Sequence, residues 1–383
     1  MKRRAFLKQA LIAGGLLSAS GLSIGRAAAN QSAEATAGRA IEGHGTAAKK
    51  IDAWSHFSTL RLLDFLEEKS GKRPHLFRAL FTNTPTLINV DARLRLMAKC
   101  GIDISVLVPL PWLETDPTVH GDPALCAEAA RLFNDELARI MAPYSDRFPR
   151  VALIPTTNPD VMMAEFERAI RDLKCVGAEV AVGPTVKRPD HPDYEILYRR
   201  AEELDVPLWL HPSRPPDYPD YVDEKVSKFQ VWQALSWLMD SSTAMVRLVF
   251  SGVYDRHPGL KLVIHHHGAL IPLFAKRIQV GWDYFEQNTG VKQPTTISRP
   301  YIEHFKKFYC DTATQGNEPL LLRLAYNFFG PERLLFGSDA PMDPKNGEMF
   351  TMDAIASLDA LDIPEADRRK IYSGNALRLL KRT

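Results

Sequence analysis

The sequence predicts a closed (β/α)₈ barrel, in which eight parallel strands alternate with helices. Two observations lead to this prediction. Eight short apolar segments rich in β-branched residues follow one another after Lys50, and amphipathic helical patterns separate them. In addition, no G-x-G-x-x-G turn follows any of these segments. Its absence disfavours the competing open, doubly wound sheet, which usually carries such a phosphate-binding turn.

The expected strands recur along the whole chain after Lys50. They are residues 51–54, 104–110, 151–154, 178–182, 208–211, 262–266, 308–311 and 334–337, and helices are expected between them, for example over 123–141, 162–173 and 194–204. The connections 58–92 and 212–230 are long and rich in loop residues. Because long loops after barrel strands usually build the substrate pocket, we expect these two segments to lie near a functional site.

The first 29 residues are typical of an export signal. Arg3 and Arg4 precede Phe-Leu-Lys, an apolar stretch follows, and residues 27–29 form a small-residue cleavage site. The paired arginines resemble the twin-arginine signal, whose export machinery carries folded proteins. The apolar run is short for a membrane span, which favours cleavage over an uncleaved anchor. We therefore expect a periplasmic or otherwise exported protein with no stable membrane span after cleavage.

The remaining composition is that of an ordinary globular protein. Residues 30–49 are rich in Ala, Gly, Ser and Thr and are expected to be a flexible lead-in, so the barrel is assigned to residues 50–383. The 48 basic and 46 acidic side chains leave a net charge of +2, without a basic patch that would attract nucleic acid. The four cysteines are scattered and form no C-x-x-C pair, which disfavours a zinc knuckle.

Ligand-type side chains follow four of the predicted strands. His56 lies just after the first strand, His211 ends the fifth, residues 265–267 are three consecutive histidines after the sixth, and Asp339 follows the eighth. Functional side chains of such barrels lie at the carboxyl ends of the strands, where these residues would meet. A single strand-end histidine is more often a hydrogen-bonded packing residue, and a single Asp is more often a turn or helix cap. The four together predict a site for one divalent ion, zinc or manganese.

Several motifs together resemble one family. They are I-D-x-x-x-H at residues 51–56, P-L-W-L-H-P at 207–212, V-Y-D-R-H-P at 253–258, H-x-G-x-x-x-P at 266–272, G-S-D-A-P at 337–341 and G-N-A at 374–376. The pattern resembles the amidohydrolase-2 family of the amidohydrolase superfamily, which includes aminocarboxymuconate-semialdehyde decarboxylase-like enzymes. The resemblance implies that His56, His211 and Asp339 are metal ligands and that His266 is a catalytic partner. It also implies a homodimer, and leaves His265 and His267 as packing or supporting residues.

One position departs from the family pattern. The family usually has His or Glu two residues before His56, where this chain has Trp54. An indole N–H is only a donor and cannot bind a cation, so one ligand is missing and weaker metal binding is expected. Trp54 is then either a packing residue or a surface on which an unsaturated substrate stacks. Arg214, in H-P-S-R, is either a bidentate partner for a substrate carboxylate or a solvated loop charge.

The leading functional hypothesis is the metal-dependent, non-oxidative decarboxylation of a small aromatic or unsaturated carboxylic acid. In this scheme the metal orients substrate oxygens, and Asp339 or His266 protonates the carbon that loses carbon dioxide. The first alternative is hydrolysis of a lactone, amide or ester, with or without a metal. The second is an inactive periplasmic binding protein, which the loss of a ligand at Trp54 would favour. The first two chemistries use the same residues, so the sequence does not separate them.

Overall fold

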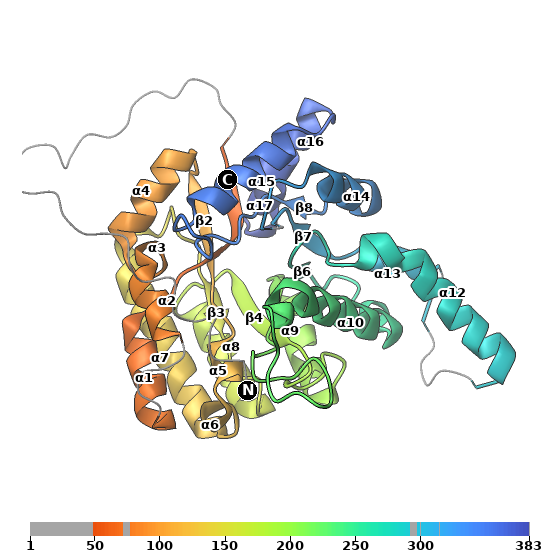
Figure 1. Ribbon diagram of the computed structural model, residues 1–383, viewed down its shortest axis with the longest axis horizontal. Helices are drawn as coiled ribbons and strands as arrows, with labels where there is room; N and C mark the ends of the chain where they lie inside the picture. The colour runs from red at the N-terminus through yellow and green to blue at the C-terminus, as the bar shows by residue number, and fades with distance from the viewer. Residues whose placement is uncertain (1–48, 72–76, 292–296, 299, 314, 383) are drawn as a thin grey trace, which may run out of the picture. The chain divides into compact units, whose positions relative to one another are not determined.

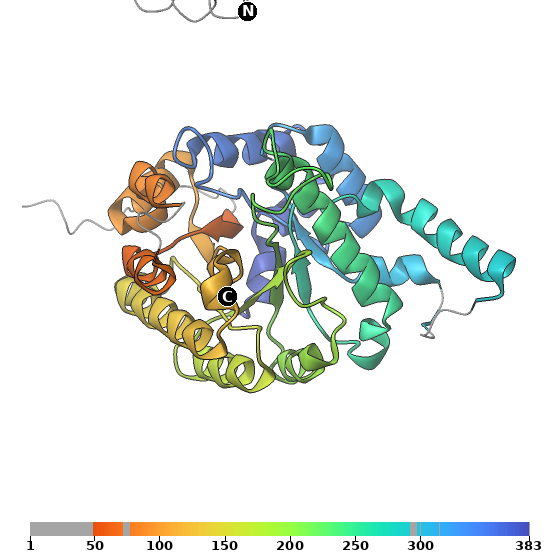
Figure 2. The same ribbon diagram turned by 60° about the horizontal axis from the view of Figure 1, so that its bottom comes forward.

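The computed structural model describes residues 49–71, 77–291, 297–298, 300–313 and 315–382, which form a parallel barrel surrounded by helices (Figures 1 and 2). The predicted export signal (1–29) and nearly all of the predicted lead-in (30–49) lie outside the described residues. The strands are β1 Ile51–His56, β2 Ile104–Val108, β3 Val151–Leu153, β4 Gly177–Val182, β5 Leu208–Pro212, β6 Leu262–Ile264, β7 Tyr309–Asp311 and β8 Leu334–Leu335. Each overlaps a segment predicted from the sequence, so the predicted (β/α)₈ architecture is confirmed.

The barrel closes because the strands pair around the full ring. β1 pairs with β2, and β3 to β8 pair in chain order, every pair being parallel. Parallel bridges between Ser55 and Ala340 and between Leu107 and Arg150 join the two sets of strands at both ends. The carboxyl ends of the strands therefore share one mouth, where barrel enzymes place their chemistry.

Helices cover the outside of the barrel and extend some of its loops. They are α1 Leu60–Ser70, α2 Arg78–Asn83, α3 Pro85–Ile88, α4 Val90–Cys100, α5 Trp112–Thr115, α6 Pro117–His120, α7 Pro123–Met141, η1 Ala142–Tyr144, α8 Pro159–Arg171, η2 Pro192–Tyr194, α9 Glu195–Leu204, η3 Trp232–Ser236, α10 Trp237–Phe250, α11 Val253–Arg256, α12 Ile271–Thr289, α13 Tyr301–Phe305, α14 Pro319–Phe329, α15 Glu348–Asp359, α16 Glu365–Arg369, η4 Lys370–Gly374 and α17 Asn375–Leu379. Among the described helices, none is long and apolar enough to span a membrane.

The alternation of side chains along the strands produces two apolar layers. One set of buried side chains packs between the strands and the surrounding helices. A second set fills the interior of the barrel, and includes Val106, Trp209, Val263, Tyr309 and Leu335. Because side chains fill the interior, the barrel has no central channel, and a substrate can bind only at the mouth.

The first residues of the long helices α7 and α8 show how the local sequence determines where a helix begins. Asp122 accepts hydrogen bonds from the first backbone N–H groups of α7, and Pro123 occupies the first helical position. Asn158 and Pro159 begin α8 in the same way. An acceptor side chain followed by proline satisfies free N–H groups and presets the backbone angle of the first turn.

Candidate active site

Asp339 and His56 meet where the loop after β8 runs beside the end of β1. His56 is the last residue of β1, and its Nε2 lies 3.0 Å from Oδ1 of Asp339. Both side chains are buried. Asp339 has a φ of 63°, a left-handed conformation that Asp tolerates better than most residues. The next helix, α15, begins only at Glu348, so Asp339 does not cap a helix.

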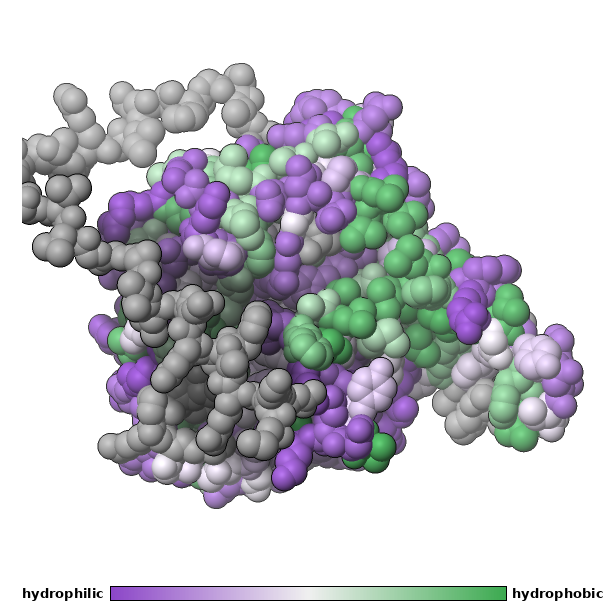
Figure 3. Space-filling view, in the orientation of Figure 1, coloured by the Kyte–Doolittle hydropathy of each residue, from purple (hydrophilic) through white to green (hydrophobic). Residues whose placement is uncertain are grey.

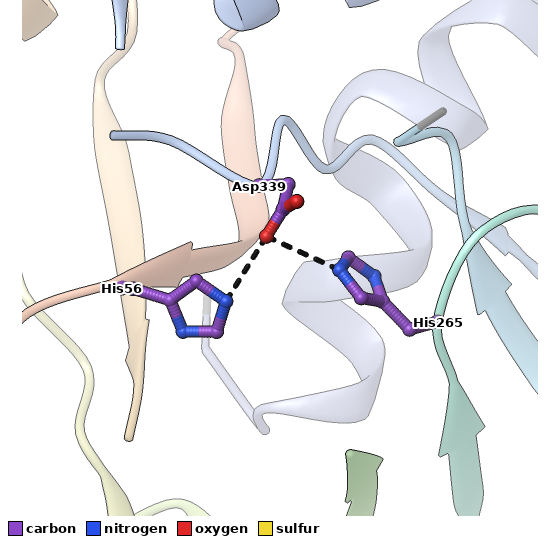
Figure 4. A group of neighbouring side chains, drawn as sticks. All are labelled: His56, His265 and Asp339. Atoms are coloured by element: carbon purple, nitrogen blue, oxygen red, sulfur yellow. Dashed lines mark hydrogen bonds and ion pairs between the residues drawn. The ribbon is translucent and has the colours of Figure 1, made fainter. Parts of the chain in front are cut away.

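His265 brings a second imidazole to the same oxygen of Asp339. It follows β6 directly, and its Nε2 lies 3.2 Å from Oδ1 of Asp339 (Figure 4). Its Nδ1 is hydrogen-bonded to Asp311, the last residue of β7. His56, His265 and Asp339 each offer a ligand atom, and these three atoms lie within 4.8 Å of one another. Sequence reasoning treated His265 as a packing or supporting residue, whereas the structure places it in direct contact with Asp339.

The acceptors that surround these two rings favour a positive charge between them. Nδ1 of His56 lies 2.9 Å from the carbonyl oxygen of Val108 while its Nε2 faces Asp339. In His265 both nitrogens face carboxylates. A neutral imidazole has one N–H and can donate to only one acceptor. Nε2 of His265 makes no hydrogen bond among the described residues, although Oδ1 of Asp339 lies 3.2 Å away, so this nitrogen can take a cation. Two imidazoles and a carboxylate are ligands for Zn²⁺ or Mn²⁺, so the residues fit a divalent ion.

The charges around Asp339 also favour a cation. Burial would raise the pKa of Asp339, but His265 and His56 outweigh it and hold that pKa well below its usual value. Burial lowers the pKa of His265, but Asp311 and Asp339 outweigh it and raise that pKa to about 9. The two carboxylates that stabilise a proton on His265 would stabilise a bound metal ion by the same electrostatic attraction.

His211, which the sequence predicts to be a metal ligand, lies beside this trio. It is in β5, and its ring centroid is 5.2 Å from that of His56 and 6.1 Å from that of His265. Its Nδ1 lies 2.7 Å from the carbonyl oxygen of Pro212, which leaves Nε2 for a ligand. Burial and the neighbouring His56 and His265 hold the pKa of His211 well below its usual value. A neutral imidazole whose other nitrogen is fixed by a carbonyl is the usual form of a metal-binding histidine.

Trp54 is fully buried under the site. Its indole lies flat against the imidazole of His265, with ring centroids 4.0 Å apart and planes within 6°. Its Nε1 has no hydrogen-bond partner among the described residues. This placement agrees with the packing role considered from the sequence, because stacking on a substrate would require an exposed ring face.

His266 and His267 follow with a change of backbone direction. Both have a φ of 57°, so the side chains no longer alternate as in a strand. Nδ1 of His266 lies 3.0 Å from the carbonyl oxygen of Ala313, and Nε2 of His267 lies 2.7 Å from that of Thr312. Burial is the main cause that lowers the pKa of each ring to about 4. His266, the predicted catalytic partner, is therefore neutral near neutral pH.

An apolar cavity of about 130 Å³ opens beside these residues. Its lining includes His266, His267, Leu270, Pro272, Gln315 and Leu324. Nε2 of Gln315 donates a hydrogen bond of 3.0 Å to Oδ2 of Asp339, which links the wall of the cavity to this carboxylate. Sequence reasoning did not find Gln315, because it lies in the loop after β7 and belongs to no motif. An apolar cavity with a few polar groups at one end is a typical small-molecule site.

Arg214 does not reach this group of residues. Its Nε and Nη2 each donate a 2.9 Å hydrogen bond to Asp240 of α10, and its guanidinium stacks on the ring of Tyr218. The bidentate fork that was predicted to hold a substrate carboxylate therefore already holds a protein carboxylate. A role for Arg214 in substrate binding stays a prediction.

Two further acidic side chains, Glu114 and Glu179, are buried and were not found from the sequence. Glu179 of β4 is buried, and neither of its carboxyl oxygens has a hydrogen-bond partner among the described residues. Oε1 of Glu114 lies 3.5 Å from the hydroxyl of Thr156, which lines a second cavity of about 390 Å³. Burial raises the pKa of Glu114 to about 7, and burial together with Glu114 raises that of Glu179 well above its usual value. Both are therefore protonated more readily than ordinary carboxyl groups.

Fold and site together define a barrel enzyme whose buried His and Asp side chains fit a divalent ion. The family model described as Amidohydrolase matches residues 51–382. The chain therefore belongs to the amidohydrolase family, as the sequence motifs predicted.

Curated relatives and solved structures of this family include decarboxylases. Gamma-resorcylate decarboxylase of Rhizobium sp. (strain MTP-10005) is 32% identical over 304 residues, covering 76% of this chain and 86% of that protein. The structure of 2,6-dihydroxybenzoate decarboxylase complexed with 2,6-dihydroxybenzoate has a TM-score of 0.69 and 28% identity, covering 88% of this chain and 100% of that one. A dihydroxybenzoic acid decarboxylase from Polaromonas sp. JS666, with bound manganese and the inhibitor 2-nitroresorcinol, has a TM-score of 0.70 and 27% identity, covering 88% and 97%.

Proposed function

We propose that the protein is a non-oxidative decarboxylase of a small aromatic carboxylic acid and uses one divalent ion, manganese or zinc. The observation that carries this proposal is the convergence of His56, His265 and Asp339 at one point beside an apolar cavity. The proposal also rests on the relatives, which are decarboxylases of hydroxylated benzoic acids, and on the manganese bound in one of them. It agrees with the leading hypothesis from the sequence.

The reaction requires one proton at carbon for each carboxylate lost. An aromatic carboxylate and a proton give the arene and carbon dioxide: a C–H bond forms at the ring carbon, and the C–C bond breaks with its electrons returning to the ring. When bound, a divalent ion would hold the substrate's carboxylate or hydroxyl oxygens and stabilise their charge. The apolar cavity beside His266 would hold the aromatic ring, and Gln315 links its wall to Asp339.

Asp339 is the better placed of the two predicted proton donors. Its carboxylate is ionised and lies in contact with His56, His265 and Gln315, so it can take a proton from a substrate hydroxyl or from water and deliver it to the ring carbon. His266 is neutral, with Nδ1 held by Ala313 and the ring facing the cavity. His266 can therefore orient the substrate through a hydrogen bond, and its neutral ring can also accept a proton.

The test is a panel of hydroxybenzoates and lactones offered to the metal-loaded enzyme. Decarboxylation in deuterated water places one deuterium on the product at the carbon that carried the carboxylate, and releases carbon dioxide. Hydrolysis of a lactone instead opens the ring and releases none. A metal-loaded protein that opens lactones and leaves every benzoate intact would replace this proposal with the hydrolase alternative.

Export belongs to the same proposal. The adjacent Arg3 and Arg4, the apolar stretch and the triple alanine at 27–29 support cleavage after Ala29 and passage through the twin-arginine machinery. A metalloenzyme that folds around its ion before export has a physical reason to use a route for folded proteins. The mature enzyme would then act in the periplasm or outside the cell.

A homodimer is the proposed assembly, and α12 is the proposed contact. This helix projects away from the barrel and carries exposed apolar side chains (Figure 2). They include Leu273, Phe274, Val280, Tyr284 and Phe285, each between 43% and 66% exposed. Figure 3 shows apolar surface over this part of the molecule. Contiguous exposed apolar side chains of this kind usually mark a protein contact, which sedimentation of the wild type and of Phe274→Glu would test.

A further inference from the structure

The position that lacks a ligand and the unexpected histidine are in direct contact. Trp54 lies two residues before His56 in β1, and its indole stacks on His265 with ring centroids 4.0 Å apart. The indole cannot bind a cation, because its nitrogen lone pair belongs to the aromatic system and its N–H only donates. The side chain at residue 54 therefore supports a ring that can bind one.

The ring of His265 is fixed on every side. Trp54 covers one face, and His266 covers the other with ring centroids 3.6 Å apart. Asp311 holds Nδ1, and Asp311 is itself held by the backbone N–H groups of His266, at 3.1 Å, and Ala313, at 2.9 Å. Nε2 can therefore point only toward Asp339, 3.2 Å away. A carboxylate on one imidazole nitrogen with the other directed at the metal is the usual support of a metal-binding histidine.

We propose that His265 is a metal ligand that replaces the one Trp54 cannot provide, with Asp311 as its positioning residue. The ion would be held by His56, His265 and Asp339, with His211 as a fourth ligand. Four ligands of this kind suit Zn²⁺, or Mn²⁺ with further positions open to substrate. The inference rests on the proposed metal dependence, but it concerns ion binding alone, so it is tested without a substrate.

The structure favours His265 over the other members of the triple histidine. His267 directs Nε2 at the carbonyl oxygen of Thr312, and His266 directs Nδ1 at that of Ala313 and lines the cavity. Among the three, only His265 has a ring nitrogen within 4 Å of a carboxylate of the site. His267 is therefore a matched control of the same residue type, neighbouring position and burial.

The first experiment measures Mn²⁺ binding to chelator-stripped full-length protein by equilibrium dialysis. His265→Gln should raise the Kd at least about tenfold, and His267→Gln should leave it within about twofold. Asp311→Asn keeps the ring in place but weakens its support, so it should also raise the Kd about tenfold. If His265→Gln lowers the melting temperature so far that its Kd cannot be measured, the Kd of Asp311→Asn tests the proposal instead.

The second experiment counts ligands directly. Pulsed electron paramagnetic resonance of bound Mn²⁺ detects directly coordinated imidazole nitrogens, and their number should fall by one in His265→Gln and stay the same in His267→Gln. Trp54→His in the His265→Gln background should restore the number and tighten the Kd. An unchanged nitrogen count in His265→Gln, or an unchanged Kd in both His265→Gln and Asp311→Asn, would overturn this proposal while leaving the decarboxylase proposal intact. A protein that binds neither Mn²⁺ nor Zn²⁺ would overturn both.

Discussion

Asp52 holds Ser338, the residue before Asp339, through both carboxyl oxygens. Oδ1 accepts the backbone N–H of Ser338 at 3.0 Å, and Oδ2 accepts its hydroxyl at 2.5 Å. All three residues are buried. Because Ser338 is covalently joined to Asp339, this contact ties the loop after β8 to β1 and fixes the carboxylate that contacts His56.

Asp52→Ala should lower both stability and metal affinity. The substitution leaves the buried N–H of Ser338 without an acceptor, which costs on the order of 1–3 kcal/mol of unfolding free energy. Asp52→Asn keeps an acceptor oxygen and should cost less, because burial already raises the pKa of Asp52 to about 7 and favours its neutral form. Urea unfolding and Mn²⁺ dialysis measure the two effects. An Asp52→Ala protein as stable as the wild type would show that the contact does not hold the loop.

His211→Ala should reduce metal content first and activity as a consequence. Its ring is neutral, with Nδ1 held by Pro212, so its removal takes away a prepared ligand without breaking a buried ion pair. Metal analysis of the purified protein should show a loss, and added Mn²⁺ should recover part of the turnover. His191→Ala, a partly exposed histidine whose Nδ1 lies 3.3 Å from Asp193, is the control. Full metal content with lost turnover in His211→Ala would make His211 a substrate-binding residue instead.

The strands and most of the site could be predicted from the sequence. Strands are periodic and buried, so their apolar patterns are visible in a single chain, and His56, His211 and Asp339 follow from their positions at strand ends. The role of Trp54 as a packing residue was among the stated alternatives. The prediction was less accurate where a contact depends on loop backbone.

His265 shows why. The motif H-x-G-x-x-x-P selects His266 by spacing, but His266 and His267 have positive φ values, so strand alternation stops there. Which ring of the three faces Asp339 then depends on backbone angles that no residue pattern records. Gln315 also has a positive φ, of 60°, and reaches Asp339 from a loop. In the sequence, Glu179 is an isolated polar residue in an apolar strand. Only its pairing with Trp209 of β5 places it inside the barrel.

Stability should fall as the pH rises through the range in which Glu114 titrates. Burial raises the pKa of Glu114 from an ordinary 4.5 to about 7. The folded protein therefore binds this proton more tightly than the unfolded chain, so the stabilisation is complete below about pH 4.5 and is lost as the pH approaches 7. The loss for this group is up to about 3 kcal/mol.

Glu114→Gln should remove this part of the pH dependence. Unfolding free energies measured by urea at several pH values should decline less between pH 5 and pH 7 in the variant, in the range that the two pKa values define. Glu128→Gln, an exposed position on α7, should leave the decline unchanged. Equal slopes in the wild type and Glu114→Gln would show that Glu114 does not retain its proton in the folded protein.

Export should depend on the arginine pair. Replacing Arg3 and Arg4 with lysine keeps the charge but removes the two guanidinium groups that characterise the twin-arginine signal. The periplasmic fraction should lose the protein, and the uncleaved precursor should accumulate in the cytoplasm. Immunoblots of fractionated cells measure both. An unchanged periplasmic yield would indicate another export route.

Asp339→Asn should abolish most turnover while leaving the fold intact. Asparagine keeps the shape, tolerates the left-handed φ of 63° and still offers a carbonyl oxygen to His56 or His265, so melting should change little. It cannot take up and deliver a proton, and loss of a general acid or base typically costs ~10²-fold or more in rate. Turnover and melting temperature are measured on the same preparation, with Mn²⁺ saturating so that weaker binding does not mimic lost proton transfer. Because Asp339 contacts both imidazoles and Gln315 and caps no helix, a purely structural role predicts the opposite pattern, a lower melting temperature with near-normal turnover. That result would move the proton transfer to His266.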